Sequence, residues 1–206
     1  VWGLYDQNVA INQIIKPGYT LCWAAKWYGE KEILFDSVLS GNRKMIRGVH
    51  ELLNDADAVC HYNGTKFDIP TLNKEFLLMG LKPPAPYSQI DLLRVARGRF
   101  RLASNKLDYV AQQLGLGKKE HHTGFDLWLE CMAKKPEAWA VMESYNKQDV
   151  RLLERVYDRL LPWIKSHPNL SVLEGRECCP NCGSSKAQAR GYAVTLARTY
   201  QRFQCR

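Results

Sequence analysis

Two short motifs offer acidic side chains that could hold a divalent metal ion. One runs from Asn63 to Asp68, with Phe67 directly before the acid, and the other runs from Tyr145 to Asp149. Tyr145 and Asp149 are four residues apart, so on a helix they share one face. A metal-binding carboxylate one turn from a phenol that can orient water suits phosphodiester hydrolysis. Each motif alone also fits a structural role, because Asp68 could cap a helix and Asp149 could lie on a charged helix surface.

The hydrophobic pattern predicts the elements that position these motifs. Apolar runs predict a β-hairpin over 19–28 and 31–36 around Gly29-Glu30, a buried strand at 58–62, another strand at 87–92, and a further strand within Val1–Ile15. Helical spacing predicts helices over 42–55, 68–79, 105–114, 124–133 and 136–164. Strands followed by alternating strands and helices indicate an α/β domain with a mixed sheet. We expect this domain to span residues 1–173.

In this order, the two motifs resemble the second and third motifs of the DEDD 3′–5′ exonucleases, the DnaQ-like branch of the ribonuclease H-like superfamily. Tyr145 matches the tyrosine-type subclass (DEDDy), and the resemblance covers about residues 10–165. It implies a ribonuclease H-like mixed sheet flanked by helices, and a hydrolase that removes terminal nucleotides from single-stranded DNA or RNA. It also implies two Mg²⁺ or Mn²⁺ ions held by four carboxylates, two of which match Asp68 and Asp149.

The same resemblance assigns roles to the remaining motif residues. Tyr145 matches the residue that positions the attacking water, and Asn63 and Phe67 match positions that line the substrate cleft. The first motif of the family is an Asp-x-Glu on the first strand, and no Asp-x-Glu occurs in these 206 residues. We expect it to precede Val1, because the segment 19–36 already matches the hairpin that follows the first strand. Asp6 and Asp36 are conceivable substitutes without the paired spacing.

Two alternatives remain open at this point. The chain could be a catalytically incomplete ribonuclease H-like module that binds nucleic acid through its basic tail, or a structure-selective endonuclease on the same fold. An Asp-x-Glu upstream of Val1 would favour the exonuclease. We expect the sequence to be trimmed at both ends, because its last cysteine also lies inside an unfinished pattern.

The cysteine pattern predicts a structural zinc site. Four of the seven cysteines lie in the last 29 residues, where Cys179-Pro-Asn-Cys182-Gly183 resembles a zinc knuckle. Cys205 follows two segments, about 187–196 and 199–204, that could form a hairpin. We predict a zinc ribbon over 174–206 with Cys179, Cys182 and Cys205 as ligands. The fourth ligand would follow Arg206 or be Cys178.

The other three cysteines, Cys22, Cys60 and Cys131, lie among apolar neighbours and are predicted to pack as small hydrophobic residues. This distribution favours a metal site in a reducing compartment over a disulfide framework. We therefore expect a cytoplasmic protein. No apolar stretch is long enough to span a bilayer, and no membrane partner is expected.

The charge distribution favours a polyanionic partner. Of the formal net charge of +8, residues 176–206 contribute +5 through six Lys or Arg and one Glu. Arginines of this tail alternate with Tyr192, Tyr200 and Phe203, a mixture suited to phosphates and exposed bases.

A second basic group has two interpretations, whereas several polar and aromatic residues are expected to have structural roles. Arg94, Arg97 and Arg101 are predicted to share a helical face, which is either a solvated surface or a track for the substrate backbone. No functional role is predicted for His121-His122. The remaining expectations are structural: Asp91 caps the helix after its strand, and Trp128, Trp139 and Trp163 belong to the core.

Overall fold

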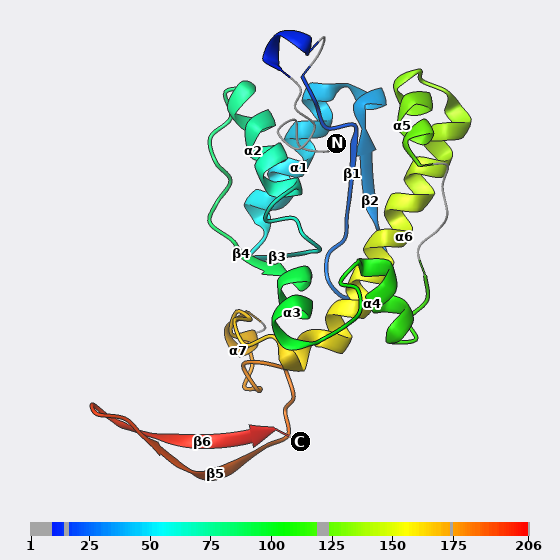
Figure 1. Cartoon of the computed structure of the whole chain (residues 1–206). Helices are drawn as coiled ribbons and strands as arrows, with labels where there is room; N and C mark the ends of the chain where they lie inside the picture. The colour runs from blue at the N-terminus through cyan, green and yellow to red at the C-terminus, as the bar shows by residue number, and fades with distance from the viewer. Residues whose placement is uncertain (1–9, 15–16, 119–123, 174, 206) are drawn as a thin grey trace.

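Three pairs of strands organise the chain in the computed structural model, which describes residues 10–14, 17–118, 124–173 and 175–205 (Figure 1). β1 (Cys22–Ala25) pairs antiparallel with β2 (Leu34–Ser37). β3 (Ala58–His61) pairs in parallel with β4 (Ser88–Asp91). β5 (Ala187–Val194) pairs antiparallel with β6 (Thr199–Cys205). The predicted hairpin over 19–36, the strands near 58–62 and 87–92 and the tail hairpin are therefore confirmed.

Helices flank the first two pairs of strands, and the α/β class is confirmed. The helices are α1 (Asn42–Asp55), α2 (Asp68–Leu78), α3 (Leu92–Arg99), α4 (Leu107–Gln113), α5 (Phe125–Met132), α6 (Pro136–Leu160) and α7 (Leu170–Leu173). Figure 1 shows α1 and α2 beside β3 and β4, and α5 and α6 beside β1 and β2. Among the described helices, none has an apolar stretch long enough to traverse a lipid bilayer.

The strand predicted within Val1–Ile15 can be compared with the structure at only a few residues. Ile11–Gln13 form a single 3-10 turn instead of part of the strand that we predicted within Val1–Ile15. Residues 1–9 and 15, which make up most of that prediction, lie outside the described residues, as do His121 and His122.

The core consists of three groups of buried side chains, and α6 contributes to two of them. Leu152 and Val156 of α6 pack with Leu92 and Val110, while Trp139 and Met142 pack with residues of α5. The third group lies between α1 and α2 and includes Met45, Ile46 and Phe76. Because α6 is buried near both ends, packing fixes the rotation of the helix and so the direction in which its other side chains point.

The three tryptophans predicted to be core differ from one another. Trp139 is buried, and Trp128 is partly buried against the same group. For Trp163 the prediction is wrong, since 56% of this residue is exposed. The helical pattern that placed it in the core ends at Leu160, and Trp163 falls in a 3-10 turn, where its ring packs edge-on against Phe100.

The turn between β3 and α2 is held by hydrogen bonds from backbone N–H groups to the side chains of buried polar residues. Asn63 has a left-handed backbone with φ of 68°. Buried Asp91 accepts hydrogen bonds from the N–H groups of Asn63 (2.9 Å) and Leu93 (3.1 Å), so it caps α3 as predicted and also ties down this turn. The N–H of Gly64 donates to Nδ1 of His61 at 3.1 Å, which brings the glycine against the imidazole ring.

We predict that Gly64→Ala destabilises the protein. A Cβ at this position would lie 2.5 Å from Cγ of His61, so the turn would have to shift. The expected loss is about 1–3 kcal/mol in the free energy of unfolding, measured by urea denaturation. Gly98→Ala is the matched control, because its Cβ would meet open space on α3 and should not lower stability. Equal stability of the Gly64→Ala variant and the wild type would contradict this account of the turn.

Candidate functional site

A cleft of about 2130 Å³ lies between the first two pairs of strands. Every residue of β1 and every residue of β3 contributes to its lining. Within the described part of the chain, β2 is the only strand that pairs with β1, and β4 is the only strand that pairs with β3. The cleft is therefore bounded by two strands that each have a single strand partner among the described residues.

Both predicted motifs line this cleft. Asn63, Phe67 and Asp68 come from the turn between β3 and α2, while Tyr145 and Asp149 come from α6. Tyr145 and Asp149 are both half-buried and contribute from the same side of α6, as their spacing predicts. The fold thus brings two acidic residues and a phenol from distant parts of the sequence to one solvent-accessible space.

Asp68 is the first residue of α2 and is exposed to solvent. The protein atoms around its carboxyl reduce its solvation, which raises the pKa of Asp68 above the usual value, and the charge of Asp91 acts in the same direction. His61 and a backbone hydrogen bond partly offset this effect. Loss of solvation favours the uncharged form, so the ionised carboxylate that a metal requires is held here at a cost.

Two features that hold α6 beside β1 were not predicted from the sequence. Lys26, just after β1, forms an ion pair with Glu154 of α6, which also accepts a hydrogen bond from the N–H of Gly29 at 3.1 Å. The hydroxyl of Tyr28 donates to Asp158 at 2.9 Å. The residues that form these contacts are more than a hundred positions apart in the chain, and nothing local to either segment indicates the pairing.

Asn146 is a further cleft residue that the sequence analysis did not single out. Its side-chain amide donates to the carbonyl of Met142 at 2.8 Å and lies 3.7 Å from Sγ of Cys22 on β1. Its signal in the sequence was its place beside Tyr145 within the third motif. The contact with Cys22 places this turn of α6 against β1.

The predicted basic group is only partly on one face. Arg97 lines the cleft together with Lys106, whereas neither Arg94 nor Arg101 is part of the lining as far as the structure describes it. Placing Arg101 on the same helical face was wrong, because α3 ends at Arg99 and Phe100 has an extended backbone. Arg94 and Arg97 remain neighbours on the exposed side of α3.

The donor types in the cleft fit Mg²⁺ or Mn²⁺, although the ligand set is incomplete. Asp68 and Asp149 supply carboxylate oxygens, which these ions prefer. Among the described residues, no three potential ligands come together in the cleft. Asp36 is not a substitute, because it lies on β2 away from the cleft lining and its carboxylate accepts hydrogen bonds from Ser37 and Ser40. Asp6 lies outside the described residues.

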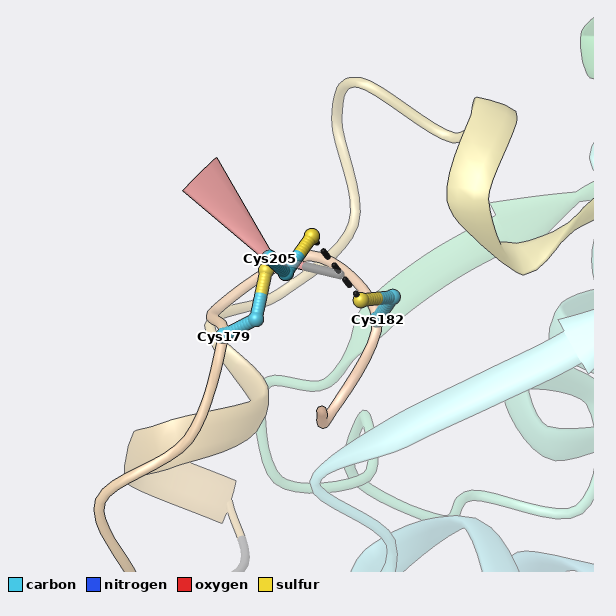
Figure 2. A group of neighbouring side chains, drawn as sticks. All are labelled: Cys179, Cys182 and Cys205. Atoms are coloured by element: carbon cyan, nitrogen blue, oxygen red, sulfur yellow. Dashed lines mark hydrogen bonds between the residues drawn. The ribbon is translucent and has the colours of Figure 1, made fainter. Parts of the chain in front are cut away.

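Three cysteines converge at the base of the tail hairpin, as predicted. The sulfurs of Cys179, Cys182 and Cys205 all lie within 4.8 Å of one another and face one another in Figure 2. The knuckle that presents them closes through hydrogen bonds from Gly183 N–H to the carbonyl of Cys179 (2.9 Å) and from Cys179 N–H to the carbonyl of Ser184 (2.8 Å). This cluster can form a zinc site.

The thiols of the cluster differ from the other cysteines in their surroundings. Burial acts to raise the pKa of Cys179, but hydrogen bonds from the Asn181 and Cys182 backbone and from the Cys182 and Cys205 thiols outweigh it and lower the pKa. Cys178 is not part of the cluster. Hydrogen bonds with Cys182 and Cys179 raise the pKa of Cys205 to about 11, so the cluster thiols differ from one another. Burial raises the pKa of both Cys22 and Cys60 to about 12, which agrees with their predicted role as packing residues.

Comparison with known proteins identifies the family. Residues 21–161, more than half of the chain, match the family model of the RNase_H superfamily. Among solved structures, the chain resembles the family B DNA polymerase from the hyperthermophilic archaeon Pyrobaculum calidifontis, with a TM-score of 0.54 and 19% identity. This match covers 64% of the chain and 20% of the polymerase, so the chain corresponds to about a fifth of that protein. No curated protein sequence matches. The chain belongs to the RNase H superfamily, and its body has the ribonuclease H-like fold.

We predict that Asp68→Asn raises the melting temperature near neutral pH. Because the pKa of Asp68 is raised in the folded state, ionisation opposes folding as pH rises through that pKa. The gain should be present at about pH 8 and should vanish below about pH 3, where the carboxyl is protonated in both the folded and the unfolded state. Thermal denaturation without divalent ions measures it, and Asp126→Asn in the first turn of α5 is the control. A lower melting temperature at about pH 8 would show that Asp68 is a stabilising cap instead.

We also predict one bound zinc ion per full-length protein, measured by elemental analysis. Cys182→Ser should remove it, whereas Cys178→Ser should keep it because this neighbouring thiol lies outside the cluster. Loss of zinc should unfold the tail hairpin, because an isolated two-stranded hairpin is marginally stable. The stability of residues 17–173 should not fall, because their core is formed without the tail. Zinc retained by the Cys182→Ser variant, or lost only from the Cys178→Ser variant, would contradict the ligand assignment.

Proposed function

We propose that this member of the RNase H superfamily is a metal-dependent 3′–5′ exonuclease of the tyrosine-type DEDD class, acting on single-stranded DNA or RNA. One observation carries the proposal: the motif ending in Asp68 and the motif from Tyr145 to Asp149 line the same cleft. Membership of the superfamily supports nuclease chemistry on nucleic acid. Residues 174–206 serve in this proposal as a zinc ribbon attached to the catalytic domain.

Each residue of the cleft then has a chemical task. Asp68 and Asp149 hold the divalent ions, which when bound generate the nucleophile and stabilise the leaving oxygen. The hydroxyl of Tyr145 orients the attacking water as a hydrogen-bond donor or acceptor, because a phenol with a reference pKa of about 10 is a poor base. Phe67, which is about half exposed at 49%, offers its ring to the terminal base. Arg97 and Lys106 lie where they can contact the phosphates of the strand.

The proposal requires more carboxylates than these two, and we expect them on a strand that enters the cleft. In the family that the motifs resemble, the Asp-x-Glu pair is carried by a strand. The cleft is bounded by β1 on one side and β3 on the other, each with one strand partner among the described residues. A strand paired with both would bring its side chains between Asp68 at the end of β3 and Asp149 on α6.

A second candidate is a nucleic-acid-binding module without catalytic activity, acting through the basic zinc ribbon. Two observations favour it: the described cleft residues include no group of three metal ligands, and the tail carries most of the excess positive charge. The two candidates differ in one measurable property, which is Mg²⁺-dependent cleavage by the full-length protein.

We predict that Asp149→Asn in the full-length protein lowers Mg²⁺-dependent cleavage by more than about 100-fold, since even outer-shell partners of a metal contribute 10–100-fold. Release of 3′-terminal nucleotides from a 5′-labelled single-stranded oligonucleotide measures both rate and polarity. Binding of the same oligonucleotide without divalent ions should persist.

Glu137→Gln is the matched control for this experiment, because it removes an exposed carboxylate from the first turn of the same helix, outside the cleft lining. Wild-type rates in the Asp149→Asn variant would reject the assigned role. Absence of cleavage by the wild-type protein with either Mg²⁺ or Mn²⁺, together with intact binding, would favour the binding module.

A further inference from the structure

The hairpin formed by β5 and β6 presents almost all of its side chains to solvent. Every residue of β6 is exposed, and so is every residue of β5 apart from the partly exposed Ala193. Figure 1 shows the hairpin extending away from the helices of the body. Its side chains therefore do not form a core, and their pattern has to be explained by what they contact outside the described chain.

The strand register separates these side chains into two faces. Directly paired residues of antiparallel strands share a face, and Gln188 pairs with Gln204 while Ala193 pairs with Tyr200. Alternation along β6 places Arg202 with them, and Arg190 reaches this face because its guanidinium donates to the side chain of Gln204. We call this set the basic face: Gln188, Arg190, Tyr200, Arg202 and Gln204. The opposite face, which we call the apolar face, contains Tyr192, Val194 and Phe203 together with Thr199 and Gln201.

The basic face concentrates charge without compensation. Neither β5 nor β6 contains an acidic residue. Arg190 and Arg202 lie on adjacent strands of the same face, and two like charges in that arrangement repel each other. The hydrogen bond to Gln204 fixes the guanidinium of Arg190 in place. Tyr200, 53% exposed, lies two residues from Arg202 on the same face and offers an open ring beside the two charges.

We propose that the basic face of this hairpin binds single-stranded nucleic acid. Arg190 and Arg202 contact consecutive phosphates, Tyr200 stacks on a base, and the two glutamines hydrogen-bond to the same strand. Charge complementarity selects this partner, because the face is cationic and contains one aromatic ring among donors. The inference deepens the proposed function, and it rests on that function in taking nucleic acid as the ligand. The hairpin becomes a second contact for the strand whose end enters the cleft.

The test compares the two faces of the hairpin in the full-length protein. Binding of a fluorescein-labelled oligothymidylate is followed by anisotropy at several salt concentrations without added divalent ions, so that no cleavage occurs. The double variant Arg190→Gln/Arg202→Gln should bind roughly tenfold more weakly at low salt. The plot of the logarithm of the association constant against the logarithm of the salt concentration should become less steep by about 1.4, or about 0.7 per charge removed. Tyr200→Leu should weaken binding with little change in slope.

The apolar face provides the matched control. Val194→Ser/Thr199→Ala, a pair on this face that offers neither charge nor ring, should bind as the wild type does. The zinc content of all variants should be equal, which shows that the hairpin is intact. Unchanged affinity and slope in the arginine variant, or a larger loss in the apolar-face variant, would overturn the inference. Cleavage is scored separately: a wild-type protein that binds through these arginines but does not cleave contradicts the proposed function and leaves this inference standing.

Discussion

The site depends on helix α6, which buries one set of side chains in the core and presents another set to the cleft. Leu152 and Val156 are almost fully buried in one part of the core, and Trp139 and Met142 in another. The same helix turns Tyr145 and Asp149 toward the cleft. Because close-packed side chains resist rotation of the helix, the burial of its apolar residues determines where these two polar groups point. The ion pair between Lys26 and Glu154 holds β1 against this helix and so keeps the cleft wall in place.

Each candidate metal site contains one candidate ligand whose surroundings raise its pKa and so disfavour its ionised form. Asp68 has a raised pKa because its carboxyl is partly desolvated, so its ionised form is less stable than that of an ordinary aspartate. In the tail, Cys205 at the end of β6 lies against Cys179 and Cys182 of the knuckle, and hydrogen bonds with Cys182 and Cys179 raise the pKa of Cys205 to about 11. A bound cation would stabilise the ionised ligands at each site. The cleft would favour a divalent ion that prefers oxygen ligands, and the tail an ion that prefers thiolates.

Local patterns predicted much of this arrangement, and long-range contacts account for the rest. The hairpin over 19–36, the turn after β3 and the cysteine knuckle follow from spacing within a few residues, and each was predictable. The ion pair of Lys26 with Glu154 and the contact of Asn146 with Cys22 join segments over a hundred residues apart, so no local pattern indicates them. Arg101 and Trp163 were misplaced because periodicity continued past helix ends that Phe100 and Leu160 mark in the structure.

We propose that Asp68 and Asp149 belong to one two-ion site in the cleft. Mn²⁺ binding to the full-length protein, followed by electron paramagnetic resonance, tests this claim without relying on cleavage. Each of the single variants Asp68→Asn and Asp149→Asn should weaken Mn²⁺ binding by more than about tenfold, with the double variant little worse than either, since both remove a ligand from the same site. Wild-type Mn²⁺ affinity in either single variant, or independent additive losses at two separate sites, would contradict the account.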